Sequence, residues 1–185
     1  MNYTLTSRDY LTQLLKDNGI SSWDTLLEYV KNLPYGRISN RNNFSLVLTE
    51  QKGTCSSKHA LLKLLADANQ IPNISLVLSL FKMTAQNTPK VKAVLEKHQL
   101  PFMPEAHCYL KINGQETDLT APNFNFKNIE PDILEEVEIK PEQAGDFKVE
   151  FHKTYVKNWL QESSSPYTFE KFWAIREQCI EALAT

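Results

Sequence analysis

Residues 53–66 read Gly-Thr-Cys-Ser-Ser-Lys-His-Ala-Leu-Leu-Lys-Leu-Leu-Ala, and they mark the change from a polar loop to an apolar helix. The pattern predicts a helix that begins at Cys55, ends near Asn69 and is buried against a sheet. The apolar positions that give this pattern are Ala60, Leu61, Leu64, Leu65 and Ala68. Free backbone N–H groups and the helix dipole stabilise a thiolate at a helix N-terminus. Cys55 is therefore the candidate nucleophile.

The composition limits the classes of function. The chain of 185 residues carries 20 basic and 22 acidic residues and is 42% hydrophobic, with a net charge of −2. This is enough for a hydrophobic core, and the balanced charge argues against nucleic acid or an anionic membrane as a partner. We expect a cytoplasmic protein, because residues 1–9 lack the pattern of a secretion signal and no apolar run has the length of a membrane span. Three cysteines without paired spacing, Cys55, Cys108 and Cys179, argue against a disulfide framework.

We expect one domain over residues 1–185, with its central motifs in 50–122 and helical additions in 1–35 and 153–185. Apolar spacing predicts two helices near the N-terminus and one near the C-terminus, over 7–17, 22–33 and Tyr167–Ala184. The segment 35–54 is polar and is expected to be a long loop with a short extended run at 44–48.

The middle of the chain mixes helix and strand signals, which predicts an α+β fold with an antiparallel sheet against the Cys55 helix. Strands are expected over 74–81, 106–112, 115–119, 133–139 and 146–152, and a short helix over 89–98. The clearest local signal is Asn113-Gly114, which favours a type I′ turn between 106–112 and 115–119.

This hairpin brings two polar residues close together. His107 and Asp118 lie on opposite sides of the turn and are expected to be near cross-strand neighbours. A carboxylate beside an imidazole orients it and stabilises its protonated form. If the start of the Cys55 helix packs on the hairpin, the three residues become nucleophile, base and orienting group.

Four short motifs follow one another within residues 50–122: Gly53-Thr54-Cys55, Ile71-Pro72, Ala106-His107-Cys108-Tyr109 and Asp118-Leu119-Thr120-Ala121-Pro122. In this order they resemble the transglutaminase-like superfamily of papain-type thiol enzymes. Tyr109 departs from the pattern, because many members have tryptophan after the histidine.

The resemblance implies a catalytic triad of Cys55, His107 and Asp118 that transfers an acyl group from an amide through a thioester, without a cofactor. A peptide or protein amide would be the substrate, and water or an amine acceptor would complete the reaction as peptidase, glutamine deamidase or transglutaminase. Gln51, four residues before Cys55, is a candidate second donor to the oxyanion.

Other interpretations stay open. His59 could join Cys55, His107 and Cys108 in a metal site, but adjacent strand residues point to opposite faces and Cys108 is expected to face the core, so we predict no metal. The fold could also serve as an inactive module that binds a protein or peptide. Exposed aromatic residues such as Tyr3, Tyr35 or Tyr167 could recruit a partner instead. The segment 82–105 either covers the cleft or packs as a surface loop.

Overall fold

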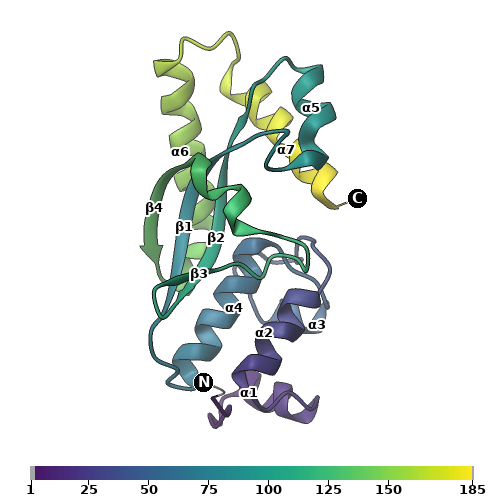
Figure 1. The fold of residues 1–185 in the computed structure, drawn as a ribbon, viewed down its shortest axis with the longest axis vertical. Helices are drawn as coiled ribbons and strands as arrows, with labels where there is room; N and C mark the ends of the chain where they lie inside the picture. Colours follow the sequence, from purple (N-terminus) through teal and green to yellow (C-terminus); the bar gives the residue numbers. More distant parts are fainter. Residues whose placement is uncertain (1–2, 185) are drawn as a thin grey trace.

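The computed structural model describes residues 3–184 and has an α+β fold with a four-stranded antiparallel sheet (Figure 1). The strand order is β3-β2-β1-β4, and β2 lies at the centre between β1 and the short β3. The strands are β1 (Ile74–Met83), β2 (Met103–Ile112), β3 (Gln115–Thr117) and β4 (Ile133–Ile139). The expected hairpin is confirmed, with Ile112 opposite Gln115 and Leu110 opposite Thr117. Asn113 and Gly114 have φ angles of 52° and 79°, the positive values that a type I′ turn requires.

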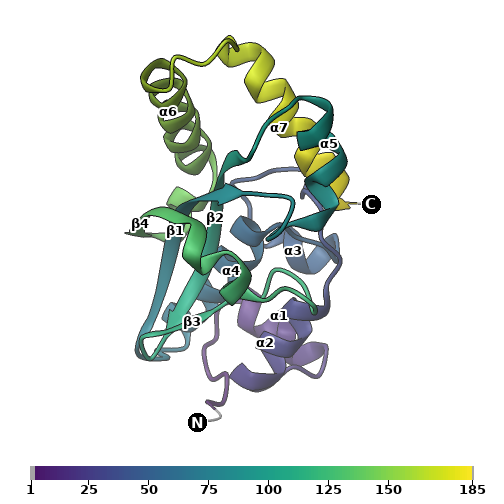
Figure 2. The ribbon, with the colours of Figure 1, turned by 45° about the horizontal axis from the view of Figure 1, so that its top comes forward.

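Residues 3–184 also form seven α-helices. They are α1 (Tyr10–Asp17), α2 (Trp23–Asn32), α3 (Leu46–Thr49), α4 (Cys55–Ala68), α5 (Lys92–Lys97), α6 (Asp146–Glu162) and α7 (Phe169–Ala184). Short 3-10 turns occupy Pro89–Val91, Phe126–Asn128, Glu130–Asp132 and Pro141–Ala144. Figures 1 and 2 show α1 and α2 at one end of the molecule and α6 and α7 at the other.

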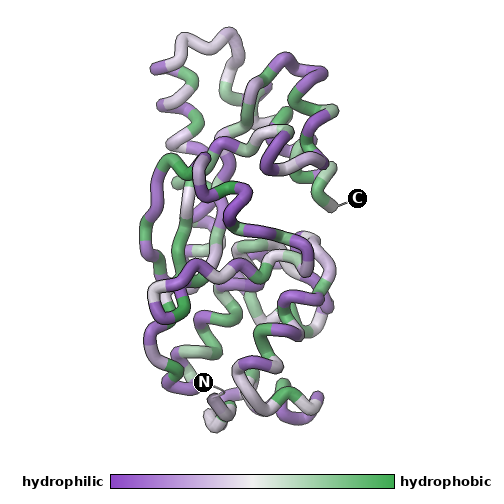
Figure 3. The backbone as a smooth tube through the Cα atoms, viewed as in Figure 1, coloured by the Kyte–Doolittle hydropathy of each residue, from purple (hydrophilic) through white to green (hydrophobic). Residues whose placement is uncertain are grey.

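Two of the expected strands are wrong. Residues 146–152 form the beginning of α6, and α3 (Leu46–Thr49) covers most of the 44–48 run. Both segments contain apolar residues that alternate only over a short distance, a pattern that does not distinguish a strand from a partly buried helix. Figure 3 shows hydrophobic and hydrophilic residues alternating along the helices, as expected for helices with one buried face.

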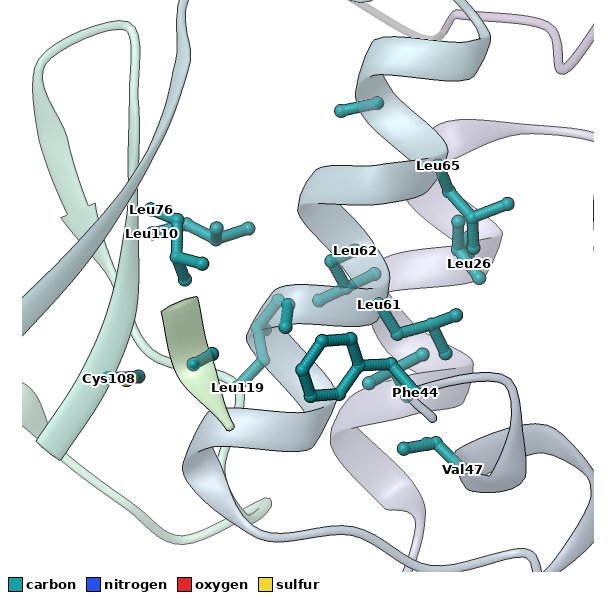
Figure 4. Close-up of a cluster of buried hydrophobic side chains, with 14 of the residues drawn as sticks. Leu26, Phe44, Val47, Leu61, Leu62, Leu65, Leu76, Cys108, Leu110 and Leu119 are labelled. Carbon is teal, nitrogen blue, oxygen red and sulfur yellow. The ribbon is translucent and has the colours of Figure 1, made fainter. Parts of the chain in front are cut away.

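The core forms two clusters. In the first, α4 lies between the sheet and the N-terminal helices. Figure 4 shows it between sheet residues on one side and Leu26, Phe44 and Val47 on the other; the labelled residues of α4 and of the sheet are Leu61, Leu62, Leu65, Leu76, Cys108 and Leu110. Cys108 is fully buried there, as predicted. Leu64 was expected on the buried face of α4 but is 38% exposed, and Leu62 is buried in its place.

The second cluster joins one end of the sheet to the C-terminal helices. Its buried members are Phe81, Met83, Val91, Leu95, Met103, Ile129, Val156, Leu160, Phe172, Ile175 and Cys179. Val91 and Leu95 belong to the segment 82–105, and α5 packs on α7. This segment therefore contributes to the second cluster, through Met83, Val91, Leu95 and Met103.

Within residues 3–184, no helix combines the length and the apolar character that crossing a membrane requires.

Candidate active site

Cys55 is the first residue of α4, as the sequence predicts. Thr54 caps the helix: its hydroxyl accepts from the Ser57 N–H at 3.5 Å, while the Ser57 hydroxyl accepts from the Thr54 N–H at 2.9 Å. The thiol therefore lies at the positive end of a 14-residue helix. It is buried, with 7% of the residue exposed.

The helix start packs against an open part of the β2 edge. Strand β3 pairs only with Leu110, Lys111 and Ile112, so within residues 3–184 the edge of β2 before Leu110 has no strand partner on that side. His107 and Cys108 of this part of β2 lie beside the Cys55 sulfur, and both lower the pKa of the thiol.

The structure also brings Asp118 to His107. Asp118 follows directly after β3, and its Oδ2 pairs with Nε2 of His107. Since Nε2 is engaged by Asp118, Nδ1 is the ring nitrogen left for Cys55. The imidazole is packed between aromatic rings, with the Phe124 centroid at 5.3 Å and the Phe81 centroid at 6.0 Å. All three residues that the sequence predicts for the triad therefore meet.

The charges in this group favour a thiolate–imidazolium pair. Burial by itself would raise the pKa of the Cys55 thiol, but the Lys148 ammonium and His107 more than offset burial and lower the pKa to about 6. Burial opposes charge on His107 as well, but Asp118 and then Cys55 raise its pKa to about 10. Asp118 is buried, yet His107 lowers its pKa to about 2. Between about pH 6 and 10 the thiolate and the imidazolium therefore coexist.

Lys148 is a charged neighbour of the thiol that the sequence did not indicate. Its Nζ lies 3.7 Å from the Cys55 Sγ and donates to the Ser56 hydroxyl at 2.6 Å. It comes from the first turn of α6, where an extended strand was expected. Lys148 is 9% exposed, so water screens its charge only weakly. Only knowledge that residues 146–152 are helical and that their first turn reaches the start of α4 would have revealed it.

His59 holds the triad in place through hydrogen bonds at both ring nitrogens. Its Nδ1 lies 2.7 Å from the carbonyl oxygen of Cys55, and its Nε2 accepts from the Leu119 N–H at 2.8 Å. The ring is therefore neutral with its proton on Nδ1, and burial lowers its pKa to about 4. It ties the first turn of α4 to the residue after Asp118. No cluster of metal-ligating side chains occurs among residues 3–184.

Lys58, which is fully buried on the same helix, also connects α4 to neighbouring segments by hydrogen bonds. Its ammonium donates to the carbonyl oxygens of Leu33 at 2.6 Å and Thr120 at 2.8 Å. Together with His59 it fixes α4 relative to the segment that carries Asp118.

A pocket of about 410 Å³ opens beside Cys55. Its walls come from segment 35–41, the start of α4, Glu105 of β2, and helices α6 and α7. Tyr35, which was expected on the surface as a partner-binding residue, lines this pocket, and Tyr3 and Tyr167 are half-buried too. The phenol of Tyr167 donates to the carbonyl oxygen of His98 at 2.8 Å. These three rings are therefore packed within the fold.

The structure does not bring Gln51 to the thiol. Its amide nitrogen donates to the Tyr29 hydroxyl at 2.7 Å and to the carbonyl oxygen of Leu48. Both amide hydrogens are therefore used elsewhere, and Gln51 is not positioned as an oxyanion donor. The left-handed conformation of Gln51, with φ 53°, turns the chain at this point.

Comparison with protein-family models, with curated proteins and with solved structures gave no match to this chain.

Proposed function

We propose that this protein is a thiol-dependent acyltransferase or amide hydrolase of the transglutaminase-like type, with Cys55, His107 and Asp118 as its catalytic triad. The observation that carries the proposal is the meeting of a helix-terminal thiol with a His107–Asp118 pair from the β2–β3 hairpin. The order of the motifs along the chain supports the transglutaminase-like assignment.

In this mechanism the Cys55 thiolate attacks an amide carbonyl, and a C–S bond forms while the carbonyl oxygen becomes an oxyanion. The intermediate collapses, the C–N bond breaks, and the His107 imidazolium gives its proton to the leaving amine. Water or an amine then gives a proton to His107, attacks the thioester and releases Cys55. Asp118 keeps the imidazole oriented throughout. The backbone N–H of Cys55 and the Lys148 ammonium are the groups near Sγ that would stabilise the oxyanion.

One observation favours the alternative of an inactive module that binds a protein or peptide. Cys55 is only 7% exposed, so a substrate reaches it only through the adjacent pocket. A buried thiol that no reagent reaches would be a structural residue.

The pH dependence of Cys55 alkylation decides between the two. Iodoacetamide is added to the native protein over pH 5–10, and modification of Cys55 is followed by peptide mass spectrometry, which separates it from Cys108 and Cys179. We expect a rate that rises with an apparent pKa of about 6, well below the value of about 8.5 for a free thiol.

The same measurement on His107→Ala provides the control, with circular dichroism to verify its fold. Loss of the low apparent pKa would support the triad and justify a screen of amide substrates. An unreactive Cys55 in the folded wild type, with normal reaction after unfolding, would refute the enzyme and favour the binding module.

A further inference from the structure

We propose that the pocket beside Cys55 binds a carboxylate, so that the acyl substrate carries an acidic group close to the reacting amide. As a statement about the substrate, this rests on the proposed function. Binding of a carboxylate as such depends only on the residues of the pocket.

The distribution of arginine is the first support. The chain has four arginines, at positions 8, 37, 41 and 176. Arg37, Arg41 and Arg176 all line this one pocket. Arginine presents a planar fork of N–H groups that matches a carboxylate, which makes it the preferred residue for binding that group.

The pocket has an excess of positive charge although the chain has a net charge of −2. Its charged lining residues are Arg37, Arg41, Lys148, Lys153 and Arg176, against Glu105 and Glu177. Cys55, which also lines the pocket, is a thiolate at neutral pH, so the surplus is two positive charges. His152 adds none at neutral pH, because burial lowers its pKa. A concave site lined by one sign of charge concentrates ligands of the opposite sign.

The cations that line the pocket differ in whether another residue of the protein already binds them. Arg176 donates to both carboxylate oxygens of Glu105, with Nε at 2.8 Å from Oε2, and its side chain is 12% exposed. The Glu105–Arg176 ion pair therefore forms part of the pocket wall, and Arg176 is not available to bind a ligand. Lys148 lies at the bottom, against Cys55.

Arg37 and Arg41 are the available cations. Each has a side chain that is 57% exposed. Arg37 makes one contact with a carboxylate, from Nη2 to Glu177 at 2.6 Å, and the Nε of Arg41 lies 3.7 Å from the Asp146 carboxylate. Most of their N–H groups are therefore free to bind a ligand.

The size of the pocket limits the ligand. A volume of about 410 Å³ suits a small molecule or one to two residues of a peptide. Ile38 and Trp173 add apolar surface beside the cations. A short acidic chain that enters between Arg37 and Arg41 would place its amide above Cys55. An acidic amide or a peptide ending in a free carboxylate fits this description.

Two alkylating reagents of nearly equal size test the charge preference at the thiol. Iodoacetate carries a carboxylate and iodoacetamide a neutral amide. The ratio of their rates on Cys55 is divided by the same ratio for glutathione, which removes their intrinsic difference. We expect a normalised ratio of about 10 at low ionic strength, decreasing with added salt.

Single variants show whether the arginines cause the preference. Arg37→Gln and Arg41→Gln should each lower the normalised ratio about threefold, and Arg8→Gln, which lies outside the pocket, should keep the wild-type ratio. A normalised ratio at or below 1, or a ratio that neither arginine variant lowers, would overturn the proposal.

A binding measurement removes the dependence on thiol chemistry. Cys55→Ala is titrated calorimetrically with the α-amide of N-acetylglutamate, which carries one side-chain carboxylate, and with its neutral counterpart, the α-amide of N-acetylglutamine. The acid should bind at least tenfold more tightly, and Arg37→Gln/Arg41→Gln in the same background should abolish the difference. Equal affinities, no binding of the acid, or tighter binding of inorganic phosphate would overturn the carboxylate site.

The two failures can be told apart. If iodoacetamide modifies Cys55 with a low apparent pKa but neither experiment shows an acid preference, the proposed enzyme stands and the carboxylate pocket fails. If neither reagent modifies Cys55 but Cys55→Ala binds the acid, the enzyme fails and the pocket stands.

Discussion

At the scale of single residues, Cys55 has two cationic neighbours from distant parts of the chain. His107 comes from the central strand, and Lys148 comes from α6, 93 positions after the thiol. Both stabilise the thiolate against the cost of burial. The low pKa of Cys55 is therefore a product of the fold and is absent from the unfolded chain.

This arrangement gives a prediction for Lys148→Met. Without the ammonium, the pKa of Cys55 should rise from about 6 toward the ordinary thiol value. Alkylation of Cys55 by iodoacetamide at pH 6.5 should slow about tenfold, while the rate at pH 10 changes little because the thiol is ionised in both proteins. Lys148→Arg, which keeps the charge, should retain most of the low-pH rate. A Lys148→Met profile identical to wild type would show that Lys148 has no part in ionising the thiol.

Asp118→Asn tests what stabilises the His107 imidazolium, the cationic partner of the Cys55 thiolate. The carboxylate raises the pKa of His107 to about 10, so its contribution to stability is complete below about pH 6.5 and is lost as the pH rises to about 10. In Asp118→Asn the pKa of His107 should fall by about 2 units or more, as measured by NMR titration of the imidazole. The alkaline loss of stability should then shift to lower pH. An unchanged His107 titration would contradict the assigned role of Asp118.

At the scale of elements, the start of α4 approaches its neighbours so closely that only glycine fits before the cap. A Cβ on Gly53 would lie 2.8 Å from Cγ of Lys58 and 3.0 Å from the Ser57 hydroxyl. Gly53 also pairs with the segment before the pocket, donating to the carbonyl oxygen of Pro34 at 3.1 Å. The glycine therefore permits the contact that positions Cys55.

Gly53→Ala should consequently lower the free energy of unfolding by about 2 kcal/mol, as overpacking of a close contact does. Gly36→Ala is the matched control, because its Cβ would meet only the flexible side chain of Lys52, at 3.3 Å. Urea denaturation followed by circular dichroism measures both. Equal stability losses in the two variants would show that the close contact at Gly53 has no special cost.

At the scale of the whole molecule, the pocket lies where the two hydrophobic clusters meet. Ile38 and Ala144 of its lining belong to the first cluster, and Trp173 packs on the second. The Glu105–Arg176 pair crosses this junction and joins β2 to α7. The C-terminal helices therefore help to build the site as well as the core.

Glu105→Gln should destabilise the protein by about 3 kcal/mol, because it removes the buried carboxylate partner of Arg176 and leaves only the more exposed Glu177. Arg176 lowers the pKa of Glu105 to about 2 despite burial. The pair therefore stabilises the fold above about pH 4.5, and this contribution is lost as the pH falls to about 2. Urea denaturation at pH 7 and pH 3 should show a smaller acid loss in Glu105→Gln than in wild type. Glu105→Gln/Arg176→Met should lose less than the sum of the single variants, and strict additivity would contradict the coupling.

The local features of the site could be predicted from the sequence because they depend on neighbouring residues. The helix start at Cys55, the turn at Asn113-Gly114 and the closeness of His107 to Asp118 all follow from capping, turn chemistry and hairpin register. The structure agrees on each of these. The burial of Cys108 follows in the same way from strand alternation.

Contacts between distant segments could not be predicted in this way. The direction of the Gln51 amide, the helix at 146–152 and the position of Lys148 depend on which segments pack together. The clustering of Arg37, Arg41 and Arg176 around one pocket likewise appears only once α7 lies beside segment 35–41. The sequence by itself therefore determined the α+β class, the helix start at Cys55 and the closeness of His107 to Asp118, since these follow from local patterns, whereas packing of α4 on β2 brought Cys55 to the pair. The tertiary structure alone decided the charge around the thiol and the shape of the pocket, because both arise from long-range packing.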